Sequence, residues 1–169
     1  MFHFLIQVET TGSDNLEDLF ELEILFLTCD EINSLGECSN LRRLSMIDNG
    51  LKKISNLSPV GNTLMSLCLC DQSITAMENL DLPQLEELFL HRNLITKIAG
   101  LNGCPRLKRL WLFQNKILSL DGLHCVPELE ECWLQANEIS SLHGLATNVE
   151  LSGLALAGNP ITGDALGAT

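Results

Sequence analysis

Leucine and isoleucine recur along the chain at a fixed long interval. Leu85, Leu107, Leu129 and Leu151 stand 22 residues apart, and the same pattern of apolar and polar positions follows each of them. The four regular copies read Leu88-x-Leu90-x-x-Asn93-x-Ile95, Leu110-x-Leu112-x-x-Asn115-x-Ile117, Cys132-x-Leu134-x-x-Asn137-x-Ile139 and Leu154-x-Leu156-x-x-Asn159-x-Ile161. A fixed period of this length predicts a solenoid, in which each copy packs mainly on its neighbours.

Three weaker copies precede the regular ones. Their pattern positions are Leu25, Leu27, Asp30, Ile32 and Leu35; then Leu44, Met46, Asn49, Leu51 and Ile54; then Leu67, Leu69, Gln72, Ile74 and Met77. We therefore predict seven repeats over residues 22–162. Residues 1–21 are predicted to be an N-terminal cap or a degenerate eighth repeat with Phe4 and Ile6 as its strand pair, and residues 163–169 a truncated C-terminal end.

Each position of the repeat has a physical role. The two leucines separated by one residue predict a short strand whose alternate side chains enter the core, and successive strands stack in parallel. The amide after the strand can satisfy backbone groups where the chain turns, and Asp30 and Gln72 are expected to keep that role. Gly and Pro interrupt the return segments, which favours turns and 3₁₀ pieces over full helices.

The 22-residue unit, with Gly-Leu after its last apolar position, resembles one subfamily of leucine-rich repeats. That subfamily is best known from a regulatory subunit of type-1 protein phosphatase and a light chain of axonemal outer-arm dynein. Residues 107–117 and 131–139 are especially similar to its multi-repeat ciliary members, and the resemblance covers residues 22–162. It implies an intracellular adaptor that holds a protein partner on its concave sheet and has no cofactor, located in the cytoplasm, the cilium or flagellum, or the cytoskeleton.

The predicted fold is therefore an α/β leucine-rich-repeat solenoid. We expect a curved horseshoe with a parallel β-sheet on its concave face, and turns and 3₁₀ segments on its convex face.

Aromatic residues occupy the strand position between the two leucines, which points away from the core. Reading this position down the chain gives Phe26, Ser45, Cys68, Phe89, Trp111, Trp133 and Ala155; two residues later come Thr28, Ile47, Cys70, His91, Phe113, Gln135 and Ala157. Contiguous exposed aromatic side chains are typical of a binding site. The alternative is that the rings only pack on one another across the strands.

Charged residues flank this aromatic set. Glu87, Arg109 and Glu131 alternate in sign on adjacent predicted strands, so we expect a cross-strand ladder that mainly solvates the rim. The candidate partner-binding residues are Phe26, Glu87, Phe89, His91, Arg92, Arg109, Trp111, Phe113, Glu131, Trp133 and Gln135.

Net charge narrows the choice of partner. The chain carries 22 acidic and 10 basic residues, a net charge of −12, which disfavours nucleic acid and anionic membrane surfaces. No apolar run approaches the roughly 20 residues that span a bilayer. The partner is therefore predicted to be a protein, bound by a monomer or by a fragment of a longer repeat protein.

The seven cysteines are odd in number and scattered, which favours free thiols in the cytosol over disulfides. Cys132 takes a core leucine position, and Cys68 and Cys70 share a strand face, where small apolar fillers are favoured over a metal or redox site.

Known catalytic, phosphate-binding and metal-binding motifs are missing, so we predict no catalytic residue, no metal and no cofactor. The leading hypothesis is a non-enzymatic scaffold for protein binding. The alternative is a regulatory subunit of an enzyme such as a protein phosphatase.

Overall fold

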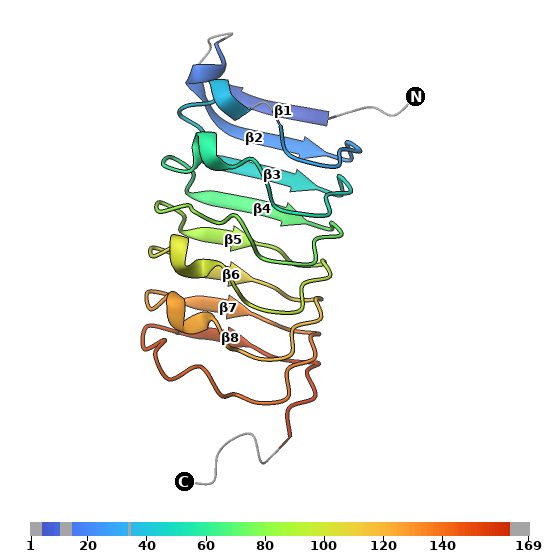
Figure 1. Cartoon of the computed structure of the whole chain (residues 1–169), viewed down its shortest axis with the longest axis vertical. Helices are drawn as coiled ribbons and strands as arrows, with labels where there is room; N and C mark the ends of the chain where they lie inside the picture. The colour runs from blue at the N-terminus through green and yellow to red at the C-terminus, as the bar shows by residue number, and fades with distance from the viewer. Residues whose placement is uncertain (1–4, 11–14, 34, 163–169) are drawn as a thin grey trace.

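The computed structural model describes residues 5–10, 15–33 and 35–162, and of residues 5–10 it describes only the backbone. Eight strands form one sheet in chain order (Figure 1). β1 (Leu5–Thr10) is antiparallel to β2 (Leu19–Leu25), and each later strand is parallel to the strand before it. These later strands are β3 (Arg43–Ile47), β4 (Ser66–Cys70), β5 (Glu87–Phe89), β6 (Arg109–Trp111), β7 (Glu131–Trp133) and β8 (Gly153–Ala155).

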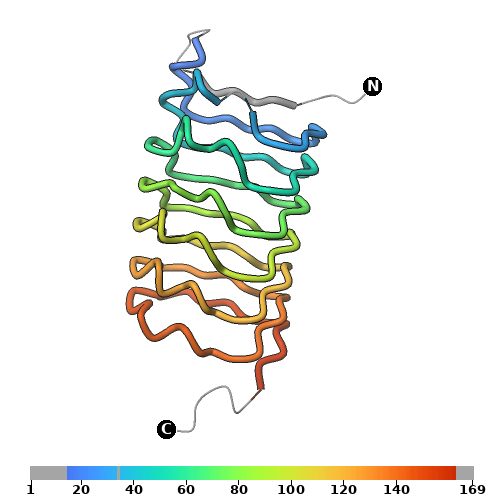
Figure 2. Tube along the Cα trace, in the orientation of Figure 1, coloured from blue at the N-terminus to red at the C-terminus, as the bar shows by residue number. Residues whose placement is uncertain are grey.

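The seven parallel strands β2 to β8 stack as the repeat predicts. Leu88 pairs with Leu110 and Leu110 with Cys132, so residues one repeat apart lie side by side. The predicted parallel solenoid is thus confirmed, and Figure 2 shows its coils stacked along one axis. Short 3₁₀ turns, also as predicted, occur in η1 (Leu16–Asp18), η2 (Leu35–Glu37), η3 (Ser58–Val60), η4 (Leu101–Gly103) and η5 (Leu123–Cys125).

Leucines of consecutive coils form one continuous core. Leu88, Leu110 and Leu112 are completely buried, and so is Cys132, which substitutes for a leucine as expected. Because each coil is too short to bury its apolar side chains alone, the neighbouring coils supply the missing cover.

Buried amides join each coil to the next. The Asn115 Nδ2 donates to the carbonyl oxygens of Leu90 and Leu112, both at 3.0 Å, and its Oδ1 accepts from the Ile95 N–H at 3.0 Å. Gln72 makes comparable bonds to the preceding coil, where it donates to the Met46 carbonyl and accepts from the N–H groups of Asn49 and Leu51. The predicted role of this position is therefore confirmed for these residues.

The first coil differs from its predicted register by three residues. Leu22 pairs with Leu44, and Ile24 with Met46, so Leu22 and Ile24 form the strand pair. The assignment of this pair to Leu25 and Leu27 is wrong.

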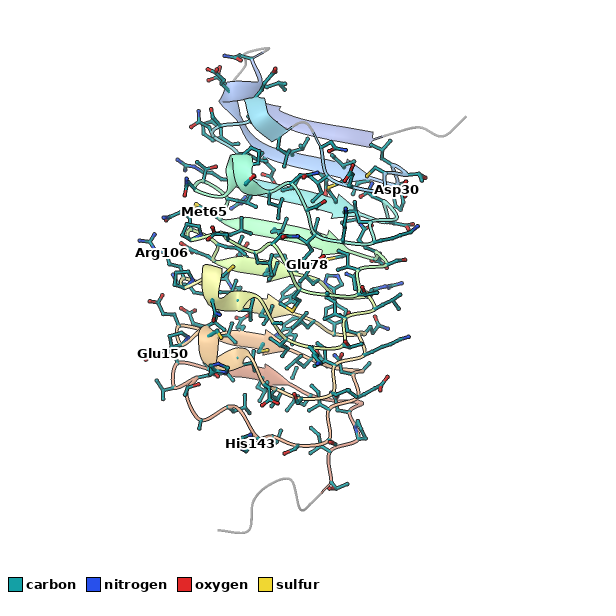
Figure 3. The ribbon with its side chains drawn as sticks, viewed as in Figure 1. Asp30, Met65, Glu78, Arg106, His143 and Glu150 are labelled. Carbon is teal, nitrogen blue, oxygen red and sulfur yellow. The ribbon has the colours of Figure 1, made fainter. Side chains whose placement is uncertain are left out.

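Leu27 takes the place that asparagine holds in other coils. It follows a residue with positive φ, Phe26, just as Asn49 follows Asp48. Asp30, predicted for that place, is exposed in the loop beyond β2 (Figure 3). The local pattern fits both registers, because leucines stand at positions 22, 25 and 27; pairing with β3 selects one of them.

The two ends of the stack are unlike its middle. Because β1 is antiparallel to β2, residues 5–10 do not continue the parallel stack. At the other end Leu154, on β8, is 38% exposed although it holds a core position. Phe4 and residues 163–169, named in the predictions, lie outside the described residues. No helix in the described part of the chain is long and apolar enough to cross a membrane.

Candidate binding surface on the open face of the sheet

One face of the sheet has no core against it, and we call it the open face. Leu88 and Leu90 are fully buried while Phe89 between them is half-buried, so alternate residues of the strands point to opposite sides. The same alternation holds for Trp111 and Trp133 on the next two strands.

Three rings form a row across β5, β6 and β7, and we call Phe89, Trp111 and Trp133 the aromatic row. The Phe89 and Trp111 ring centroids are 4.5 Å apart, and the two indoles stack at 4.4 Å with an interplanar angle of 5°. Aromatic contacts of this kind stabilise by about 0.5–1.5 kcal/mol each beyond the area they bury. These contacts fix the three rings relative to one another.

His91 and Phe113 form a second aromatic pair beside the row. Their rings stack at 4.2 Å, and the His91 ring also lies 6.2 Å from Trp111. The parallel pairing continues past the strand ends, because the Gln114 N–H donates to the Gln135 carbonyl at 2.8 Å. Phe113 and Gln135 thus keep the register of the sheet and reach the open face, as predicted.

His91 also contacts the thiols of β4. Its Nδ1 is 3.2 Å from the Cys70 Sγ, which is 3.0 Å from the Cys68 Sγ. Burial lowers the pKa of His91, and nearby Arg92 adds to this while Asp71 opposes it. The imidazole is therefore neutral at pH 7 and adds apolar area to the face.

The thiols differ in character. The hydrogen bond between the two thiols lowers the pKa of Cys68, and that same bond, with burial, raises the pKa of Cys70. Burial raises the pKa of Cys132 to about 12. All seven cysteines are free, and no cluster of His, Cys, Asp or Glu within the described ranges is arranged to hold a metal ion.

Every arginine near the open face already has a carboxylate partner. Arg109 pairs with Glu87, Arg92 with Asp71 at 2.5 Å, and Arg43 with Glu21 at 3.7 Å.

Only one rung of the predicted ladder is present as an ion pair. Glu131 makes no ion pair with any residue that the structure describes, and neither does Glu23 on β2. The open face is therefore left with unpaired negative charge and no unpaired arginine among its described side chains.

Because the first coil has a different register from the predicted one, one residue predicted for the open face does not lie on it. Phe26 is 59% exposed with φ 55°, in the turn after β2, and Glu23 takes the strand position assigned to it. Arg92 also lies in the turn after its strand, with φ 59°. The structure brings together the other predicted residues: Glu87, Phe89, His91, Arg109, Trp111, Phe113, Glu131, Trp133 and Gln135.

The small residues at the C-terminal edge of the aromatic row were not predicted to be part of the site. β8 presents Gly153 and Ala155 beside Glu131 and Trp133, so the residues after the tryptophans are very small. The sequence does contain this information, because Ala155 holds in the last repeat the position that Trp133 holds in the repeat before it.

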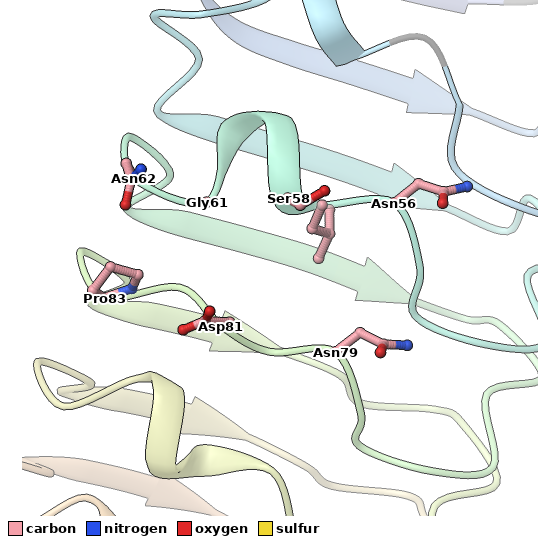
Figure 4. A pocket seen from close by; sticks show the side chains of 8 residues that line it. Asn56, Ser58, Gly61, Asn62, Asn79, Asp81 and Pro83 are labelled. Atoms are coloured by element: carbon pink, nitrogen blue, oxygen red, sulfur yellow. The ribbon is translucent and has the colours of Figure 1, made fainter.

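A polar hollow lies on the return side of the solenoid, with a volume of about 380 Å³ (Figure 4). It lies between the return segments of the coil that contains η3 and of the following coil, and its lining includes Ser58, Asn62 and Asp81. Asn56 and Asn79, also in the lining, donate to the carbonyl oxygens of Ile32 and Ile54, both at 2.7 Å. These amides are thus already used in joining coils.

Comparison with known proteins supports the repeat assignment. Residues 83–124 match the family model of leucine rich repeats, in two copies. These residues include β5, β6 and most of the aromatic row. No curated protein sequence matches the chain.

Solved structures share the fold at low sequence identity. An internalin of Listeria monocytogenes is 24% identical with a TM-score of 0.71, over 86% of this chain and 43% of that chain. Internalin C2 of the same species is 22% identical with a TM-score of 0.64, over 87% and 75%. A leucine-rich-repeat protein of Leptospira interrogans is 22% identical with a TM-score of 0.69, over 76% and 35%. The chain thus spans less than half of two of these three proteins, and the likeness extends to the fold alone.

Proposed function

We propose that this leucine-rich-repeat solenoid is a non-enzymatic scaffold that binds a protein partner on its open face, across the aromatic row. The observation that carries the proposal is the stack of Phe89, Trp111 and Trp133, half-buried on a sheet face with no core against it. Large aromatic side chains held on a rigid surface are the usual anchors of protein interfaces.

Charge favours a partner with a basic surface. The net charge is −12, and the arginines near the open face are all engaged with carboxylates. The unpaired carboxylates of Glu23 and Glu131 would repel an acidic partner and attract a basic one.

The proposed location is the cytoplasm, including the cilium, where free thiols persist and where the subfamily resembled by residues 107–117 and 131–139 acts. The alternative function, a regulatory subunit of an enzyme such as a protein phosphatase, uses the same face. Phosphatase activity that copurifies with the chain would favour this alternative over an adaptor without enzymatic association.

The test compares the wild type with a Trp111→Ala/Trp133→Ala variant. The partner is captured from native lysate, identified, purified and bound again as a pure component. Because a single interface tryptophan commonly contributes more than about 2 kcal/mol, we expect binding to weaken at least about thirtyfold. Hydrogen exchange of the wild-type complex should show protection of residues 87–91, 109–113 and 131–135.

A matched control removes exposed apolar side chains elsewhere. Leu94 and Leu118 are 40% and 55% exposed in the turns after the strands, so Leu94→Ala/Leu118→Ala should leave binding unchanged. Both variants must keep the wild-type circular dichroism spectrum. Equal binding by the folded tryptophan variant would place the interface elsewhere and end the proposal.

A further inference from the structure

The aromatic row ends abruptly at Trp133. One face of this indole packs on Trp111 at 4.4 Å, and on its other side β8 places Ala155 in register. No ring contact with Trp133 other than that of Trp111 occurs among the described residues. The face of the indole toward β8 is thus bordered by a methyl group instead of a ring, and we call Trp133, Glu131, Gly153 and Ala155 the Trp133 shelf.

The carboxylate of Glu131 belongs to this shelf. A Cβ on Gly153 would lie 3.3 Å from the Cγ of Glu131, so the Glu131 side chain extends over β8 above the glycine. Arg109, on the opposite neighbouring strand, pairs with Glu87 instead. Glu131 therefore leans toward the side of Trp133 that faces β8, and it has no described cation as a partner.

One side chain matches this arrangement of an aromatic face beside an unpaired carboxylate. A guanidinium is planar, stacks on aromatic faces, and carries five N–H donors around its edge. A lysine ammonium lacks the planar shape, and a neutral planar group lacks the charge that Glu131 attracts.

We propose that the partner places an arginine side chain on the Trp133 shelf, stacked on the indole, with its N–H groups donating to the carboxylate of Glu131. This inference rests on the proposed function and names the chemistry of the contact. The ion pair between Arg109 and Glu87 leaves the carboxylate of Glu131 available for it.

The test uses the two indole N–H resonances of the chain, which belong to Trp111 and Trp133. A capped Gly-Arg-Gly peptide is titrated into the ¹⁵N-labelled protein, beside peptides with citrulline or lysine in place of arginine. We expect the Trp133 resonance to shift on addition of the arginine peptide, with a dissociation constant on the order of millimolar. The citrulline peptide, which keeps the shape and loses the charge, should bind at least about fivefold more weakly.

Two variants test the position of the site. Glu131→Gln should weaken binding of the arginine peptide about fivefold, while Glu130→Gln, an equal change of charge on the exposed neighbouring residue, should leave it within about twofold. Ala155→Leu should block the shelf without removing the carboxylate of Glu131. Absence of a shift with the arginine peptide, equal binding of the citrulline peptide, or equal effects of the two glutamate variants would overturn the inference.

The same variants separate this inference from the proposed function. If Trp111→Ala/Trp133→Ala loses the purified partner while Ala155→Leu and Glu131→Gln keep it, the open face binds the partner without an arginine on the shelf. If all of these variants keep the partner, the proposed function fails as well.

Discussion

At the scale of single residues, the buried asparagines replace backbone hydrogen bonds that the turns cannot make. Asn115 is 8% exposed, and its amide forms hydrogen bonds with Leu90 and Ile95 of the preceding coil and with Leu112 of its own coil. Removing the amide leaves two carbonyl groups and one N–H group without this partner inside the protein, where each unsatisfied group costs about 1–3 kcal/mol.

We predict that Asn115→Ala lowers the free energy of unfolding by about 3 kcal/mol, measured by urea denaturation. Asn102→Ala serves as its control, because Asn102 is exposed within η4, and this change should cost less than about 0.5 kcal/mol. Similar losses in the two variants would show that the amide contributes little.

At the scale of the coil, the return turns approach the preceding coil in two ways. In the earlier coils Asn56 and Asn79 donate to the carbonyl oxygens of Ile32 and Ile54. In a later coil Gly122 stands at the same place with φ 103°, and a Cβ there would collide with the carbonyl group of Ile98. An amide thus bridges the early coils, while a bare Cα lets the later coils pack backbone against backbone.

We predict that Gly122→Ala lowers the free energy of unfolding by at least about 2 kcal/mol, because the new methyl group must push two coils apart at a backbone angle unfavourable for alanine. The matched control is Gly36→Ala in η2, where a Cβ meets no atom within 4 Å. Thermal unfolding of both variants measures the difference, and a Gly122→Ala protein as stable as the control would contradict the packing described.

At the scale of the whole molecule, the position of a coil in the stack determines how much its core residue contributes. Leu110, on β6, and Leu154, on β8, hold the same place in their coils and lie two repeats apart. Leu110 is fully buried between neighbours on both sides, whereas Leu154 is 38% exposed. In a one-dimensional stack, the interfaces with adjacent coils supply much of the stability.

We predict that Leu110→Ala destabilises the chain by about 3 kcal/mol, and Leu154→Ala by about 1 kcal/mol or less. Urea denaturation of the two variants provides the comparison, with each change removing the same number of atoms. Equal losses would mean that the solenoid covers its C-terminal coil as well as its middle ones.

Much of this architecture is determined by the sequence alone. The 22-residue spacing predicts the parallel sheet, and the residues at the leucine positions from Leu44 to Ile139 form the buried core. The alternation along each strand also places Phe89, Trp111 and Trp133 on the open face. These inferences succeed because side-chain direction in a strand and packing between identical coils depend on local pattern.

Other features are decided only by the tertiary structure. The pairing of β2 with β3 selects Leu22 and Ile24 over Leu25 and Leu27, because the first coil contains leucines that satisfy either register. Likewise, Arg109 lies between Glu87 and Glu131 in sequence-equivalent positions and pairs with Glu87. A local pattern cannot rank such alternatives, since their energies differ only through contacts between coils.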